Sequence, residues 1–103
     1  MTLTSKERAV FRKEAHHLAA LVHVGQNGLT ESLIESLRDA LRTRELVKVQ
    51  LGRQAELPAR EAAQQLAEAT RSDVVQVIGR TATFYLENPD LERKKGALPA
   101  WRR

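Results

Sequence analysis

Short runs of β-branched residues alternate with longer amphipathic segments along most of this 103-residue chain, and that alternation most constrains its fold. In the longer segments apolar side chains recur every three or four residues, as on one face of a helix. In the short runs they recur every second residue, as on one face of a strand. Alternation of strands and helices favours parallel pairing through right-handed crossovers. We therefore expect an α/β domain.

The order of elements predicted from these patterns is α-β-α-β-α-β-β, in a two-layer domain with a four-stranded mixed sheet. Thr4 and Glu7 have the spacing of a capping box at the start of the first helix, and Thr30 is the expected N-cap of the second. Pro58 suits the first turn of the third helix. The last two strands form a hairpin. The expected helices cover residues 5–18, 31–42 and 58–70, and the strands residues 21–24, 46–51, 74–78 and 82–86.

The apolar positions predict which side chains form the core. Phe11, Ala15 and Leu18 recur on one face of the first helix. Phe84 and Tyr85 are adjacent in a strand, so they point to opposite faces of the sheet. One of the two is expected in the core, and the other is either a second core residue or a ring that stacks on a nucleic-acid base.

The charge balance favours a polyanionic partner. The chain has 17 Lys and Arg against 13 Asp and Glu, a net charge of +4. Positive charge gathers at both ends of the chain and the acids lie in the middle, although a solvated surface would also accept such a distribution. Residues 93–103 hold five Lys and Arg and no acid, so residues 89–103 are expected to be a basic tail after a domain over residues 1–88.

Several classes of protein are excluded or disfavoured. There is no cysteine, which removes disulfides, thiolate metal sites and cysteine nucleophiles. No apolar run approaches the roughly 20 residues that span a bilayer. The N-terminus has no apolar stretch after its charges, so no signal peptide is expected and the predicted location is the cytoplasm.

The sharpest motif is the G-x-x-G run from Gly25 to Gly28, between a predicted strand and a predicted helix. Glycines let a ligand approach the backbone closely, and a helix N-terminus offers free N–H groups and positive potential to a phosphate. The alternative is a purely structural role, in which the glycines only permit a turn. The run is not a P-loop, because no Lys-Ser/Thr follows, and it lacks the third glycine of a dinucleotide fingerprint.

Other side chains are candidates for the same site. Gln26 and Asn27 are able to reach a sugar or a phosphate, and Arg80 in the predicted hairpin turn is either a solvated residue or a second phosphate contact. The first helix carries two basic rows. Its candidate RNA-binding residues are Lys6, Arg8, Arg12 and Lys13.

No catalytic or metal constellation is found. His16 and His17 are sequential and diverge by about 100° on a helix, so they and His23 are interpreted as surface histidines. Arg38 and Arg42 follow acids at i+3 spacing, which predicts an ion-paired solvent face on the second helix.

Four ordered blocks of sequence resemble one family. They are residues 15–18, AHHL; residues 24–31, VGQNGLTE; residues 45–49, ELVKV; and residues 75–81, VQVIGRT. With their spacing, they resemble the CRM domain family (chloroplast RNA splicing and ribosome maturation), and within it the bacterial single-domain YhbY-type members. The resemblance covers the chain from about Leu3 to Leu86.

The resemblance implies a fold like the C-terminal domain of translation initiation factor 3 with an added N-terminal helix. It also implies RNA binding through the G-x-x-G loop with a flanking patch made of the first helix and Arg80, and association with precursors of the large ribosomal subunit. We expect a non-enzymatic, monomeric RNA-binding protein without cofactor, metal or membrane partner. One alternative is a protein–protein adaptor recruited through a ribosomal protein. A second, an RNA-modifying enzyme, needs a cofactor pocket or a catalytic group that the sequence does not show. The full set of expected RNA-binding residues is Gly25, Gln26, Asn27, Gly28, Thr30, Lys6, Arg8, Arg12, Lys13 and Arg80.

Overall fold

The structure is a computed structural model that describes residues 4–25, 28–52 and 58–87. The predicted order α-β-α-β-α-β-β and the four-stranded mixed sheet are confirmed. The tail expected over residues 89–103 lies outside the described residues. The helices are α1 (Ser5–Ala15), α2 (Glu31–Arg44) and α3 (Ala59–Thr70), and the strands are β1 (Val22–His23), β2 (Leu46–Gln50), β3 (Asp73–Ile78) and β4 (Thr81–Tyr85).

The sheet has the strand order β1-β2-β4-β3. β1 and β2 are parallel, whereas β4 is antiparallel to both β2 and β3. The second strand of the hairpin therefore inserts between β2 and β3. Gln50 pairs with Thr81 at one end of the sheet, and Leu46 pairs with Tyr85 at the other. These are called the Gln50 end and the Leu46 end below.

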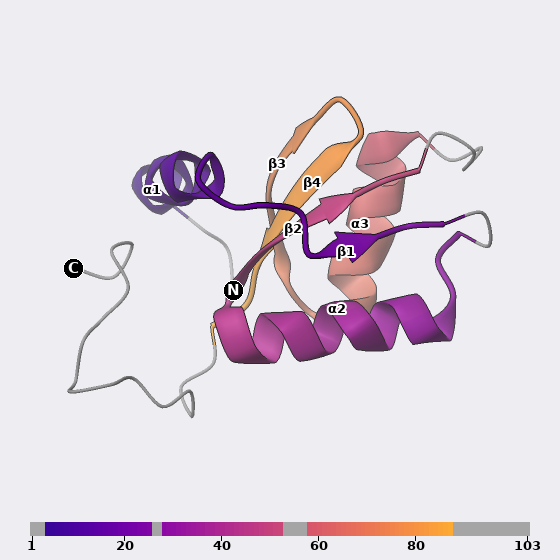
Figure 1. Cartoon of the computed structure of the whole chain (residues 1–103). Coiled ribbons are helices and arrows are strands. Elements are labelled where there is room, and N and C mark those ends of the chain that lie inside the picture. The colour runs from indigo at the N-terminus through magenta and orange to yellow at the C-terminus, as the bar shows by residue number, and fades with distance from the viewer. Residues whose placement is uncertain (1–3, 26–27, 53–57, 88–103) are drawn as a thin grey trace.

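Helices cover both faces of the sheet (Figure 1). α2 and α3 form one layer, and their apolar side chains pack with Val47, Val49 and Phe84 in the main core. α1 lies on the opposite face, where Phe11 joins a smaller cluster with Tyr85. The two rings stack with centroids 4.2 Å apart and planes at 22°. Tyr85 is thus buried in a second core, and the alternative that it stacks on a base is wrong.

The predicted N-caps of α1 and α2 are confirmed. The hydroxyl of Thr4 accepts from the amide of Glu7 at 3.1 Å, and the Glu7 carboxylate accepts from the Thr4 amide at 3.0 Å. The hydroxyl of Thr30 accepts from the amide of Leu33 at 3.1 Å. Pro58 is the N-cap of α3 and not a residue of its first turn. Each helix thus begins within one residue of its predicted start.

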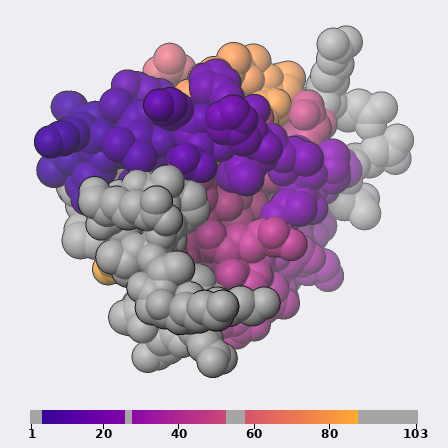
Figure 2. All heavy atoms as spheres, turned by 60° about the vertical axis from the view of Figure 1, so that its left-hand side comes forward, coloured from indigo at the N-terminus to yellow at the C-terminus, as the bar shows by residue number. Residues whose placement is uncertain are grey.

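α1 ends three residues earlier than predicted, at Ala15. Beyond that point the amides of His16, His17 and Leu18 donate to the carbonyl three residues back instead of four, and bonds to β2 follow. The Leu18 carbonyl accepts from the ammonium group of Lys48 at 3.2 Å, and the Leu21 amide donates to the Lys48 carbonyl at 3.1 Å. Leu18, expected on the buried face of the helix, is 37% exposed. Figure 2 shows α1 and the segment that follows it as one continuous ridge along the surface.

The remaining differences in element bounds are small. α2 runs two residues further than predicted, to Arg44, because the backbone first leaves the helical region at Glu45, with φ of 65°. β2 stops before Leu51, whose amide donates to the Arg80 carbonyl at 2.6 Å. β1 covers only two residues, fewer than the four predicted, although the flanking amides of Leu21 and Val24 also donate to β2, at 3.1 and 2.9 Å. The hairpin turn has two residues instead of three, so β4 begins at Thr81.

The capping box makes the start of α1 sensitive to acid. Hydrogen bonds from the backbone amide and the side chain of Thr4 hold the pKa of the Glu7 carboxyl below its ordinary value of 4.5. A carboxyl with a lowered folded-state pKa stabilises the fold fully above its unfolded pKa, and that contribution is lost as the pH falls through the folded-state pKa. The first turn of α1 should therefore fray as the pH falls below 4.5.

The Thr4 amide resonance, followed by NMR as the pH is lowered, measures this effect. In Glu7→Gln the side-chain oxygen still accepts from Thr4 but has no proton to gain, so the acid-dependent change should disappear. An identical change in both proteins would contradict the assignment.

Candidate functional site

The G-x-x-G run forms a tight turn between β1 and α2. The Gly28 amide donates to the Gly25 carbonyl at 3.1 Å, and the Thr30 amide donates to the Gly28 carbonyl at 3.1 Å. The other two predicted loop residues, Gln26 and Asn27, lie outside the described residues. Because β1 pairs with the last residues of β2, this turn lies at the Gln50 end of the sheet.

The two glycines serve different purposes. Gly28 has φ of +72°, in the left-handed region where a side chain is strained, so the turn itself requires glycine there. Gly25 has no such φ, and a Cβ at Gly25 would meet nothing within 4 Å apart from its neighbours in the chain. The fold therefore does not require glycine at position 25. Because position 25 has no side chain, the backbone of the turn is accessible to a ligand.

The turn leads directly to the N-terminus of α2. The first backbone bond of that helix runs from the Ile34 amide to the Thr30 carbonyl, at 3.0 Å, so the amides of Glu31 and Ser32 precede it. The Thr30 hydroxyl accepts from Leu33 and keeps its own proton to donate. These groups favour an anion ahead of the helix, while the Glu31 carboxylate adds negative charge to the same turn.

Two further segments contact this turn. A Cβ at Gly52 would lie only 2.6 Å from the Val24 carbonyl oxygen, so the chain after β2 touches the end of β1 because position 52 is glycine. The guanidinium of Arg80, in the β3–β4 turn, donates to the Gly52 carbonyl. The sequence does not indicate the contact that Gly52 makes, since no local pattern shows which strand ends will meet.

Arg80 is close to the loop, as predicted, but its side chain already donates a hydrogen bond within the protein. It is half-buried, and besides the bond to Gly52 its Nε has no hydrogen-bond partner among residues 4–25, 28–52 and 58–87. Arg80 therefore positions the segment behind the loop. Its predicted contact with a phosphate stays a prediction.

The predicted basic patch does not form as expected, because α1 lies away from the loop. The Arg8 guanidinium donates to the carbonyls of Val74 and Val75, the latter at 3.3 Å, on edge strand β3. Phe11 packs at the Leu46 end of the sheet. In Figure 1, α1 and the start of α2 are on opposite sides of the molecule. The expectation that the first helix flanks the loop is therefore wrong.

The basic residues of α1 are nevertheless accessible. Lys6, Arg12 and Lys13 are exposed, and Arg8 is half-buried. Together with α3, this helix borders a groove of about 400 Å³ along β3. Its lining residues are Arg8, Arg12, Arg60, Gln64, Val74, Val75, Gln76 and Val77. The sequence patterns did not single out Arg60 or Gln64, because their i, i+4 spacing does not show which face of α3 borders the sheet.

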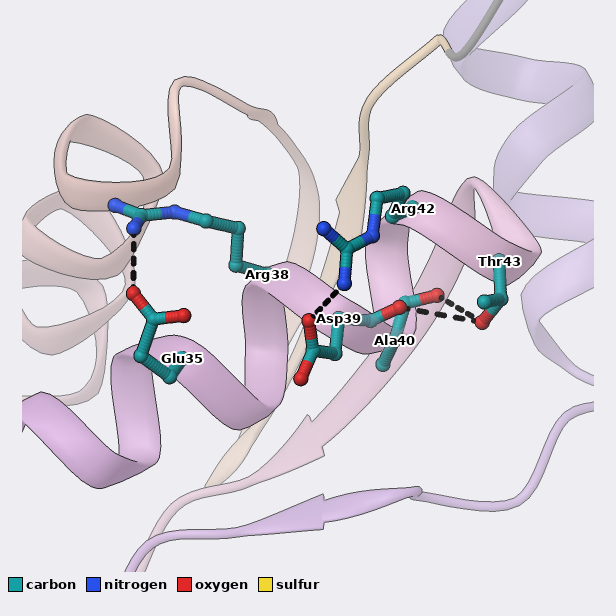
Figure 3. A network of polar contacts seen from close by, with 6 residues as sticks. All are labelled: Glu35, Arg38, Asp39, Ala40, Arg42 and Thr43. Atoms are coloured by element: carbon teal, nitrogen blue, oxygen red, sulfur yellow. Dashed lines mark hydrogen bonds and ion pairs between the residues drawn. The ribbon is translucent and has the colours of Figure 1, made fainter. Parts of the chain in front are cut away.

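The outer face of α2 is balanced in charge, as predicted. Arg38 pairs with Glu35 at 2.7 Å, and Arg42 pairs with Asp39 (Figure 3). The Thr43 hydroxyl donates to the Asp39 carbonyl at 3.2 Å. This face therefore offers a partner little unpaired positive charge.

The histidines lie on the surface. His16, His17 and His23 are all exposed, and within the described part of the chain no three potential metal ligands come together. Over the same residues, none of the helices has the length and apolarity needed to cross a bilayer.

Comparison with known proteins yields one family. The model of the CRS1 / YhbY (CRM) domain matches residues 3–85. The probable RNA-binding protein YqeI of Bacillus subtilis is 36% identical over 97 residues, which are 94% of this chain and 99% of YqeI. The probable RNA-binding protein PA4753 of Pseudomonas aeruginosa is 38% identical over 89 residues, 86% of either chain.

A solved structure has the same fold. The solution structure of the hypothetical protein SAV1595 from Staphylococcus aureus superposes with a TM-score of 0.72 at 35% sequence identity. The superposition covers 95% of this chain and all of SAV1595. The arrangement of helices and sheet described above is thus shared with a relative solved by experiment.

The contact between Gly52 and Val24 predicts a specific loss of stability. Gly52→Ala would force a methyl group against the Val24 carbonyl, so we expect it to lower the free energy of unfolding by about 1–3 kcal/mol. Gly25→Ala is the matched control, because the added methyl meets no atom there, and it should leave stability nearly unchanged. Urea denaturation of the three proteins measures both effects. Equal midpoints for Gly52→Ala and the wild type would contradict the close contact.

Proposed function

The chain belongs to the CRS1 / YhbY (CRM) domain family, and from this premise we propose that it binds RNA through the turn between Gly25 and Gly28. The proposal agrees with the names of its relatives in Bacillus subtilis and Pseudomonas aeruginosa, both described as probable RNA-binding proteins. It assigns the contact to the RNA backbone, which a turn rich in glycine can approach closely.

The observation that carries the proposal is the open backbone at Gly25. The fold has room for a side chain there and no strained φ to relieve, yet the position is glycine. A phosphate or ribose in close contact with the turn supplies a reason, since a Cβ would occupy its space. The neighbouring amides of Glu31 and Ser32 at the start of α2 add donors and positive potential for the same phosphate.

Other predicted residues complete the proposed contact. Gln26, Asn27 and the Thr30 hydroxyl donate to phosphate or ribose oxygens. Arg80 holds the Gly52 carbonyl and so fixes the segment against which the turn rests. In this mechanism the protein holds RNA by position and charge and carries out no chemical step.

The specific partner we propose is ribosomal RNA in precursors of the large subunit, whose assembly the protein would assist. This part of the proposal rests on the resemblance to the bacterial YhbY-type members of the family. The protein would act as a monomer in the cytoplasm, without cofactor.

Replacing Gly25 separates binding from folding. Gly25→Ala should weaken RNA binding several-fold while the melting temperature stays the same or rises slightly, because the added methyl meets only the ligand. Gly25→Asp should weaken binding further, since it adds a carboxylate beside a phosphate. Fluorescence anisotropy with a labelled RNA hairpin measures affinity, and a thermal melt checks the fold. Unchanged affinity in both variants would move the site elsewhere.

The ribosomal assignment has its own test. In cell extract separated on a sucrose gradient, the protein should sediment with large-subunit precursors, and added protein-free ribosomal RNA should compete it away. Binding to phosphates also predicts release as salt is raised. If free ribosomal RNA does not compete, contact with a ribosomal protein, as in an adaptor module, explains the association better.

A further inference from the structure

We propose that the groove between α1 and α3 along β3 is a second site for the RNA backbone, in which Arg12 and Arg60 bind phosphates. This inference rests on the proposed RNA binding and adds a place on the molecule where it occurs. It assigns a role to Arg60, a residue of α3 that no sequence motif includes.

The groove is formed by helices on opposite faces of the sheet. α1 packs beside Tyr85 on one face and α3 packs beside Phe84 on the other. β3 is the edge strand between them, so its residues form the floor. Arg8 and Arg12 are four residues apart on one wall, and Arg60 lies on the other. The two walls thus bring together guanidinium groups from distant parts of the sequence.

The charge in this groove is unbalanced. None of its lining residues is acidic. Within the described residues, Arg12 and Arg60 are exposed and make no hydrogen bond or ion pair. On α2, by contrast, Arg38 and Arg42 each have a carboxylate partner (Figure 3). Unpaired like charges that face one groove repel each other, and a bound anion relieves that repulsion.

Arg8 adds a fixed charge at the base of the groove. Its Nη1 donates to the carbonyls of Val74 and Val75, which holds the guanidinium against the strand edge. A guanidinium presents two parallel N–H groups to a phosphate, so arginine suits this ligand better than lysine does. No aromatic residue lines the groove, so base stacking contributes nothing there. The groove therefore fits the phosphates of RNA without preference for sequence.

The groove and the loop are separate contacts. β1, which leads to the loop, is at one edge of the sheet and β3 is at the other. Three strand spacings separate the edges, about 14 Å. α1 also packs toward the Leu46 end, whereas the loop lies at the Gln50 end. One RNA molecule that occupies both contacts must therefore span at least this distance.

The test compares two double variants with the same change in net charge. Arg12→Gln with Arg60→Gln removes two unpaired guanidinium groups from the groove. Arg38→Gln with Arg42→Gln removes two ion-paired ones from α2 and is the control. A fluorescein-labelled RNA hairpin is titrated with each protein from about 50 to 200 mM salt. The groove variant should bind at least threefold more weakly, and its salt slope should fall by about 1 for each phosphate that the groove no longer binds.

Each outcome decides between the possibilities. Weaker binding and a smaller slope in the groove variant alone support the second site. Equal affinity in the groove variant and the wild type overturns it, and so does an equal loss in both variants, which would reflect net charge only. If the wild type itself does not bind the hairpin, the proposed RNA binding fails first and the second site fails with it. Thermal melts of all three proteins exclude a loss of fold.

Discussion

Two adjacent rings on β4 join the sheet to the helices on both of its faces. Phe84 and Tyr85 point to opposite faces of a central strand, and both are buried. Phe84 joins the core under α2 and α3, whereas Tyr85 stacks on Phe11 of α1. Burial of an aromatic side chain is worth about 1.5–3 kcal/mol, so each face gains an anchor. A chain of this size can thus hold helices on both faces of one small sheet.

The proposed binding surfaces follow from that arrangement. Because β4 lies between β2 and β3, the β3–β4 turn reaches the Gln50 end, where Arg80 donates to Gly52 and Gly52 touches Val24. The same insertion leaves β3 as an edge strand with α1 and α3 on its two sides. The fold thus presents the glycine turn at one edge and a groove lined by Arg12 and Arg60 at the other.

Features that depend on neighbouring residues, such as caps and turns, could be predicted from the sequence. Features that depend on contacts between distant segments could not. The capping box of Thr4 and Glu7 is local, and so is the turn at Gly25 to Gly28. The segment after α1 also depends on distant residues, because Lys48 of β2 donates to the Leu18 carbonyl. The position of α1 away from the loop was not predictable either, since it depends on the pairing order of the strands. The spacing of the two glycines also does not show that Gly28 adopts a positive φ and Gly25 does not.

The central claim is that RNA contacts the turn before α2. The most direct measurement is an RNA titration of the 15N-labelled protein, with the amide chemical shifts as the readout. We expect the largest shifts at Gly25, Gly28 and the first turn of α2, Glu31 to Leu33, with a second set along β3. Shifts confined to the outer face of α2, around Arg38 and Arg42, would contradict the claim.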